Sequence, residues 1–120
     1  MPVIDMHAHL TPERYKAAIR DSGGEATWVS LDVASDASVA AAVAHAVDTF
    51  GGLHVLYNNA GISPGDDDGP VNTSDATWAT VLDVNVTGVA RCCRHGIPAM
   101  LESGGGSIVN VASFVAHVGA

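Results

Sequence analysis

The sequence predicts an α/β fold, in which an incomplete parallel sheet of about four strands lies between layers of helices. Short apolar runs rich in β-branched residues alternate with longer helical stretches throughout the 120 residues. One run, at 53–61 (LHVLYNNAG), is apolar and then changes abruptly to two amides, an alanine and a glycine. A buried parallel strand that leaves its sheet in a tight turn has this pattern, and ligands bind beyond such strand ends. The composition, 48% hydrophobic and 15% charged, is that of a folded globular domain.

The first strand is predicted at 3–8 and is followed by a helix. Thr11 is a suitable N-cap, Pro12 suits the first helical position, and the helix is expected to end near Arg20, before two glycines. A second strand is predicted at 27–33 (TWVSLDV), because β-branched and aromatic residues are frequent in it. These elements make the first strand–helix–strand unit.

The next helix carries one apolar stripe and has clear signals at both ends. Ser35 or Asp36 can cap its first turn, and the glycine pair 51–52 can end it. The central strand at 53–61 follows directly. The segment 62–73 contains glycine, proline and a run of three aspartates, which is the composition of a loop.

The longest helix is predicted at 75–101, with Ser74 as its N-cap. Pro98 is expected to bend or terminate this helix, because proline lacks the backbone N–H that a helix interior uses. A last strand is predicted at 107–112 (SIVNVA), after three consecutive glycines. The resulting order of strands and helices requires parallel pairing with crossover connections.

Two polar residues of this second half are candidates for a site. On a helical wheel with about 100° per residue, Asn85 shares one face with Trp78, Leu82 and Val89, so its amide is expected to face the sheet. It either satisfies carbonyls freed at a helix irregularity or belongs to a site. Ser113 follows the last strand, where a serine either caps a turn or contributes to catalysis.

Charge and hydropathy exclude several classes of partner. The formal net charge of -8, with five Lys and Arg residues, disfavours binding to nucleic acid phosphates and to anionic lipid surfaces. No apolar run approaches the roughly 20 residues needed to cross a bilayer, and the first residues do not resemble a signal peptide, so a cytoplasmic location is expected. Cys92 and Cys93 are adjacent on one predicted helix, point in different directions and are expected to be free thiols.

Four short motifs occur in an order and spacing that resemble the short-chain dehydrogenase/reductase family. They are Leu-Asp-Val at 31–33, Asn-Asn-Ala-Gly at 58–61, Asp-Val-Asn-Val-Thr-Gly at 83–88 and Gly-Ser-Ile-Val-Asn-Val-Ala-Ser at 106–113. The resemblance extends from about residue 20 to residue 120. It implies a three-layer, Rossmann-like sheet and reversible hydride transfer between NAD or NADP and a carbonyl or secondary alcohol.

The resemblance also implies roles for individual residues. Asp32 and Val33 match positions beside the adenine ring of the cofactor. The turn that lines the dinucleotide is matched by Asn58, Asn59, Ala60 and Gly61. Asn85 matches the asparagine that holds a water in the proton relay, and Ser113 matches the serine that hydrogen-bonds the substrate oxygen. The helix at 75–101 matches one that often pairs subunits, so a homo-oligomer is expected.

Two elements of the family pattern do not occur in these 120 residues. The sequence has no Gly-x-x-x-Gly-x-Gly turn for the pyrophosphate and no Tyr-x-x-x-Lys pair to move the proton. We therefore expect a fragment of an NAD(P)-dependent oxidoreductase that is inactive as this chain stands.

The first 20 residues resemble a different family. The stretch Val-Ile-Asp-Met-His-Ala-His-Leu-Thr-Pro-Glu-Arg-Tyr is similar to the start of metal-dependent amidohydrolases, in which a His-x-His pair binds Zn²⁺. His7 and His9 project from one face of the predicted strand, as zinc ligands would. Two histidines do not complete a zinc site, and the barrel that would supply the others is not predicted, so no bound zinc is expected.

The predicted organisation is an amidohydrolase-like strand and helix start at 1–20, joined to a partial Rossmann-like domain at 21–120. The first strand is expected to fill the gap between the strand at 27–33 and the central strand, where the family has two strands. Two alternative functions are a fragment of a metal-dependent amidohydrolase or decarboxylase, and a nonfunctional chimeric product.

Overall fold

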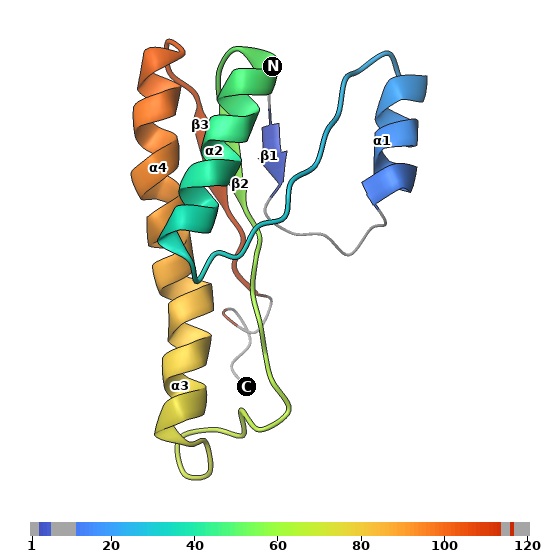
Figure 1. The fold of residues 1–120 in the computed structure, drawn as a ribbon. Coiled ribbons are helices and arrows are strands. Elements are labelled where there is room, and N and C mark those ends of the chain that lie inside the picture. The colour runs from blue at the N-terminus through green and yellow to red at the C-terminus, as the bar shows by residue number, and fades with distance from the viewer. Residues whose placement is uncertain (1–2, 6–11, 114–115, 117–120) are drawn as a thin grey trace.

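The computed structural model describes residues 3–5, 12–113 and 116 and shows an α/β fold. Its sheet has three parallel strands in the order β1 (Val3–Asp5), β2 (Val55–Asn58) and β3 (Ser107–Asn110), as Figure 1 shows. The predicted incomplete parallel sheet, with the 53–61 run at its centre, is therefore confirmed.

The register of the sheet shows where the first strand lies. Val3 stands opposite Val55, so the predicted pairing of the first strand with the central strand is confirmed, but β1 is an edge strand of the described sheet and does not lie between two strands. On the other side of β2, Asn58 stands opposite Asn110. The remainder of the predicted first strand and the Thr11 cap lie outside the described residues.

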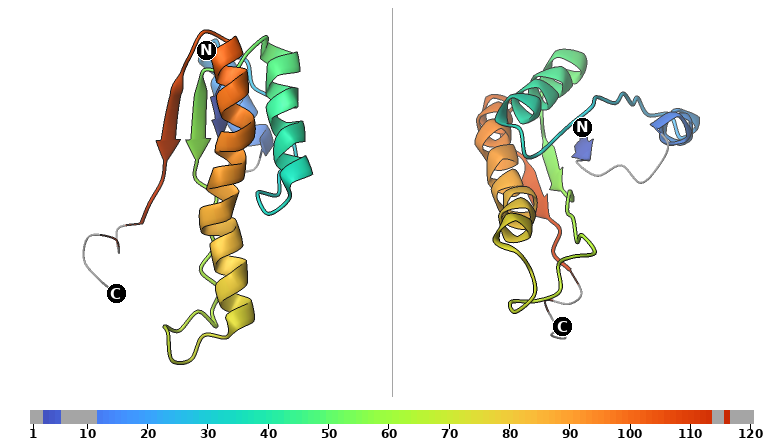
Figure 2. Two further views of the ribbon diagram at one scale, coloured as in Figure 1. Left: turned by 90° about the vertical axis from the view of Figure 1, so that its left-hand side faces the viewer. Right: turned by 60° about the horizontal axis from the view of Figure 1, so that its bottom comes forward.

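Two helical elements pack on one face of the sheet, and a third stands apart from it (Figures 1 and 2). The helices are α1 (Pro12–Asp21), α2 (Asp36–Phe50), α3 (Asp75–Leu82) and α4 (Gly88–Glu102), with a π-helical turn, η1 (Asp83–Thr87), between α3 and α4. In Figure 1 and in the right-hand view of Figure 2, α2 and α4 lie side by side against the sheet, whereas α1 stands away from it. Of the three layers expected, the described residues supply the sheet and one helical layer.

The small core lies between β2 and these two helices. Its buried residues are Val33, Val39, Val43, Leu53, Leu56, Cys92 and Met100. The ends of α2 are set as its sequence predicts, because the Ser35 hydroxyl accepts a hydrogen bond from the Ser38 N–H and Gly51 adopts a left-handed φ of 79°. Of the two candidate caps, Ser35 is the one used.

The prediction of a strand at 27–33 is wrong. This segment is an irregular connection between α1 and α2, and Trp28 and Val29 are 55% and 42% exposed. A strand requires a neighbour to complete its hydrogen-bond ladder, and among the described residues none pairs with this segment. The sheet consequently has three strands instead of about four.

The helix predicted at 75–101 is confirmed in extent but not in regularity. Ser74 caps it, because its hydroxyl accepts a hydrogen bond from the Thr77 N–H at 3.1 Å. The π-turn η1 interrupts it, and the chain stays helical past Pro98 to Glu102, so Pro98 does not terminate the helix. The predicted loop at 62–73 contains turns but no helix or strand.

Candidate cofactor-binding site

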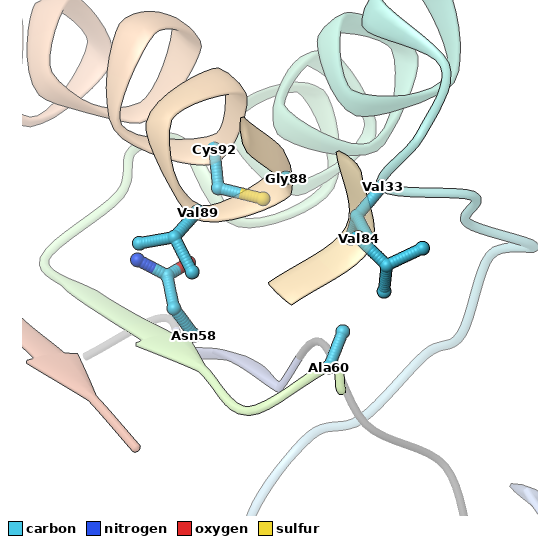
Figure 3. A pocket seen from close by; sticks show the side chains of 7 residues that line it. All are labelled: Val33, Asn58, Ala60, Val84, Gly88, Val89 and Cys92. Carbon is cyan, nitrogen blue, oxygen red and sulfur yellow. The ribbon is translucent and has the colours of Figure 1, made fainter. Parts of the chain in front are cut away.

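A shallow hollow lies where β2 ends and η1 passes into α4 (Figure 3). Its walls are Val33, Asn58, Ala60, Val84, Gly88, Val89 and Cys92. Three of the residues predicted to contact a cofactor, Val33, Asn58 and Ala60, thus come together from separate parts of the chain. The hollow is shallow and does not enclose a ligand-sized space, so it offers an apolar surface to one side of a ligand.

The segment that brings Val33 to the hollow is fixed by local hydrogen bonds. The backbone N–H of Asp32 donates to the Ser38 hydroxyl at 2.9 Å, and the Asp32 carboxylate accepts from the Ala34 N–H at 2.9 Å. The Asp32 side chain is exposed, whereas Val33 is buried. A carboxylate accessible to a ligand therefore adjoins an apolar wall.

Asn58 links two strands while it lines the hollow. It is 3% exposed, and its side-chain amide donates to the side-chain oxygen of Asn110 at 2.8 Å. Its own side-chain oxygen accepts no hydrogen bond from the described residues, although buried polar atoms are normally paired. Asn59 and Gly61 follow in the same turn but are not part of the wall.

Asn85 lies on the π-turn and holds the chain that leaves β2. Its side-chain oxygen accepts from the Ile62 N–H at 2.8 Å, and its amide donates to the Ile62 carbonyl at 2.9 Å. The helix is irregular here, as one of the two alternatives for Asn85 required, but the amide pairs with a neighbouring loop and not with freed helix carbonyls.

The prediction that the face of Asn85 packs on the sheet is wrong. Asn85 is exposed, and Trp78 and Leu82 are 42% and 48% exposed. One reason is that α3 extends beyond the carboxyl edge of the sheet (Figure 1). The other is that the π-turn adds a residue to one turn, which rotates later positions relative to a regular wheel.

Ser113 lies three residues beyond β3 and is exposed. Because β2 and β3 are parallel, Ser113 follows the same edge of the sheet as the turn after Asn58. The structure thus places it at the predicted edge. Within the described part of the chain, no hydrogen bond joins Ser113 to Asn85.

Arg91 is a residue of this site that sequence reasoning missed. Its guanidinium bonds to the Asp83 carboxylate at 2.7 Å and to the Val33 carbonyl at 3.1 Å. The side chain is 16% exposed. One sequence signal could have indicated it: Arg91 is a cation between Gly88 and Cys92, which are buried on the side of the helix that faces the core.

The two cysteines differ in environment, and both are free, as predicted. Cys92 is 1% exposed, and burial, helped by the neighbouring Cys93, raises the pKa of its thiol from 9.0 to about 11. Cys93 is partly exposed. The Cys92 side chain that lines the hollow is therefore neutral at physiological pH and acts as an apolar wall.

His7 and His9 lie outside the described residues, so the zinc pair remains a sequence-based prediction. In the described ranges, no three His, Cys, Asp or Glu side chains are grouped so that they could hold a metal ion. No helix in those ranges combines the length and the hydropathy needed to cross a membrane.

Comparison with known proteins identifies relatives of this chain. A family model described as short chain dehydrogenase matches residues 4–120, so the match begins inside the segment whose sequence resembles amidohydrolases. The cis-4-hydroxycyclohexanecarboxylate dehydrogenase of Sinomonas cyclohexanicum is 43% identical over 103 residues, which cover 85% of this chain and 41% of that protein. The cyclohexanol dehydrogenase of an Acinetobacter species is 40% identical over 101 residues, which cover 81% of this chain and 38% of that protein.

The fold is also similar to those of several solved structures. A short-chain dehydrogenase/reductase from Burkholderia xenovorans superimposes with a TM-score of 0.69 at 41% identity, covering 78% of this chain and 36% of that one. NADH-dependent reductase A1-R' in complex with NAD gives a TM-score of 0.81 at 26% identity, covering 97% of this chain and 50% of that one. The chain spans about two fifths of the length of the curated relatives it matches. Since the family model covers nearly all of its residues, the chain belongs to the short-chain dehydrogenase family.

Proposed function

We propose that this chain binds the adenosine end of NAD or NADP and forms part of an oxidoreductase that transfers hydride between the cofactor and a carbonyl or secondary alcohol. The observation that carries the proposal is the hollow beyond β2, which unites Val33, Asn58 and Ala60. These residues were expected at a cofactor from the sequence motifs. Ligands bind at this edge of open α/β sheets.

The chemistry of the hollow fits an adenine ring. Its walls are apolar except for Asn58, and a shallow apolar surface suits the flat face of one ring better than a whole dinucleotide. One oxygen of the Asp32 carboxylate accepts from Ala34 N–H, and the exposed side chain leaves the other oxygen available to accept from an exocyclic amine. The backbone of Asn59 and Gly61 is proposed to line the adjoining part of the cofactor.

Ser113 and Asn85 are proposed to serve the reaction. Ser113, exposed beyond β3, would donate a hydrogen bond to the substrate oxygen as hydride moves. Asn85 would hold a water of the proton relay from a helix turn that its clamp on Ile62 keeps in place. The nicotinamide supplies hydride chemistry when bound.

The names of the relatives support the substrate class. They include dehydrogenases of cis-4-hydroxycyclohexanecarboxylate, of cyclohexanol and of 3-alpha- or 20-beta-hydroxysteroids, which are secondary alcohols. We propose a small secondary alcohol or ketone as the substrate of the oxidoreductase. Because the 120 residues contain no Tyr-x-x-x-Lys, this chain by itself is proposed not to turn over.

A titration of NADH or NADPH fluorescence with the purified chain tests the proposal. We expect saturable binding, and a loss of about tenfold or more in affinity for Ala60→Leu, whose larger side chain would fill the hollow. Ala76→Leu, at an exposed position of α3, is the matched control and should bind as the parent does.

Lack of saturable binding by the folded chain would refute the proposal and favour the nonfunctional chimeric product. The alternative of a metal-dependent hydrolase or decarboxylase rests on His7 and His9 and stays a prediction. Zinc that remains bound in stoichiometric amount after dialysis, and is lost when both histidines are changed, would support it.

A further inference from the structure

Arg91 joins three parts of the chain around the hollow. Its side chain extends from α4, pairs with the Asp83 carboxylate of η1 at 2.7 Å, and donates to the Asp83 carbonyl at 3.3 Å. Its guanidinium also donates to the Val33 carbonyl at 3.1 Å. Since the side chain is 16% exposed, these bonds are shielded from solvent more than those of a surface ion pair.

The π-turn is what allows Arg91 to reach Asp83. In a regular α-helix, residues eight positions apart differ by about 80° around the axis. A π-turn accommodates one extra residue, so Asp83 and Arg91 are related as if seven apart, which leaves about 20° between them. The pair therefore depends on the same irregularity that carries Asn85.

The segment that Arg91 holds is bonded to the start of α2 through Asp32 and Ser38, but it has few anchors to η1 and α4. In the described ranges, the bond from Arg91 to Val33 is the only hydrogen bond that joins residues 25–34 to η1 or α4. The segment has no strand partner there. Val33 also touches Gly88, where an added Cβ would lie 2.9 Å from Val33 Cγ2. In addition to the packing of Val33 in the core, one hydrogen bond from Arg91 and one close contact with Gly88 thus position it against α4.

We infer that Arg91 is a positioning residue that fixes Asp32 and Val33 at the hollow and so sets the affinity for an adenine-containing ligand. This inference rests on the proposed function. Arg91 acts through Val33 and is not expected to contact the ligand. Its guanidinium geometry matters because two acceptors on different elements must be bonded at once.

The test compares Arg91→Leu and Arg91→Lys with Arg94→Leu. Arg94 is a matched control, since it is a cation on the same helix, pairs with Asp36 and is 61% exposed. Binding of AMP, of NADH and of nicotinamide mononucleotide is measured by calorimetry on the 120-residue chain. Because a charge-assisted bond to Val33 is lost, AMP and NADH affinity should fall about tenfold in Arg91→Leu, less in Arg91→Lys and less than about twofold in Arg94→Leu.

Amide hydrogen exchange supplies a readout that does not need the ligand. In Arg91→Leu, exchange should accelerate in peptides spanning residues 25–35 and stay unchanged in β2. A ligand-free chain that exchanges alike with and without Arg91 would overturn the inference, as would an Arg91→Leu variant with parental AMP affinity. If Arg91→Leu does not fold, Arg91→Lys decides, because its single ammonium group cannot bond Asp83 and Val33 in the guanidinium geometry. Failure of the unmodified chain to bind AMP or NADH would refute the proposed function, and hydrogen exchange would still decide the role of Arg91.

Discussion

Asn85 uses both ends of its amide to hold the backbone of Ile62 beside the π-turn. The residue expected to take part in a proton relay is thus also a structural clamp on the loop that leaves β2. Its two bonds are exposed, so each contributes less than a buried one would.

Replacement of Asn85 by Ala should lower the free energy of unfolding by about 1–2 kcal/mol, since two hydrogen bonds to one residue are lost. Asn72→Ala is the control, because Asn72 makes one exposed side-chain bond, to Asp68, and should change stability by less than about 0.5 kcal/mol. Urea unfolding followed by circular dichroism measures both. Equal stability of Asn85→Ala and the parent would show that the clamp is dispensable.

Alkylation should distinguish the two thiols. The thiolate is the reactive form, and a pKa of about 11 leaves Cys92 almost entirely protonated at neutral pH. Iodoacetamide should therefore label Cys93 in the native chain, and both thiols should react in denaturant. Mass spectrometry of Cys92→Ser and Cys93→Ser identifies the site, and faster native labelling of Cys92 would contradict the burial seen in the structure.

At the scale of elements, local signals predicted where helices begin and end. Ser35, Ser74 and the turn at Gly51 act through hydrogen bonds to their near neighbours, so the sequence alone reveals them. The π-turn itself was not predicted, because the bonds that accompany it, from Asn85 to Ile62 and from Asp83 to Arg91, do not follow from local sequence signals. The absent strand at 27–33 has a related cause, since pairing requires a neighbour that composition does not specify.

Adding one methyl group at Gly88, where α4 contacts Val33, should destabilise the fold. Gly88→Ala places a Cβ 2.9 Å from Val33 Cγ2 and 3.1 Å from its Cβ. The valine side chain has few rotamers, so relieving this close contact requires a shift of the backbone. We expect the free energy of unfolding to fall by about 1–3 kcal/mol, which exceeds the gain of about 1 kcal/mol in helix propensity. Thermal unfolding measures the difference.

Gly65→Ala is the control for that comparison, because no atom lies within 4 Å of an added Cβ there. Gly65→Ala should change the midpoint temperature of thermal unfolding little. A Gly88→Ala variant more stable than the parent would show that Val33 yields readily and that the close approach is not a constraint.

Charged side chains also link α4 to the start of α2. Arg94 lies 2.9 Å and His95 3.1 Å from the two carboxylate oxygens of Asp36, which joins α4 to the start of α2. The close contact with His95, followed by the hydrogen bond from Arg94, holds the pKa of Asp36 below 3.8. The stabilisation is therefore present above that pH and is lost as the pH falls through the lowered pKa.

When the pH is lowered below 3.8, the melting temperature of the parent should accordingly fall more than that of Asp36→Asn. The carboxylate is exposed, so the difference will be small. Parallel curves for the two proteins would show that Asp36 does not contribute to the acid sensitivity of the fold.

At the scale of the whole molecule, large apolar surfaces are open to solvent in the described structure. Trp78, Leu82 and Val86 lie four residues apart and are 42%, 48% and 59% exposed. The residues of β3 are exposed along its whole length, and β1 and β3 are the edge strands of the described sheet. Such surfaces and edges favour association.

We therefore expect the isolated chain to self-associate and to have marginal stability, with the helix at 75–101 as the proposed contact between copies. Leu82→Lys should shift sedimentation toward the monomer, whereas Val71→Lys, at a loop residue that is 90% exposed, should not. A monodisperse monomer with a cooperative thermal transition would contradict this expectation.

The candidate site was predictable to the extent that it follows strand ends. Val33, Asn58 and Ala60 were expected there and line the hollow, because a strand end places its turn at the sheet edge whatever the rest of the chain does. Arg91 was not predictable, since its partners Asp83 and Val33 become neighbours through the π-turn and the path of an unpaired segment. Cofactor identity and location in the cell stay predictions.

The bond between the side chains of Asn58 and Asn110 has a consequence for how the chain folds. The two residues stand opposite each other in adjacent parallel strands, both of which are short and rich in similar apolar residues. An offset of one residue would turn Asn110 to the opposite face and leave the nearly inaccessible Asn58 amide with only its weak contact to Cys93 Sγ at 3.7 Å, at a cost of about 1–3 kcal/mol. The amide pair therefore selects one alignment of β2 and β3 from several that the backbone would accept equally well.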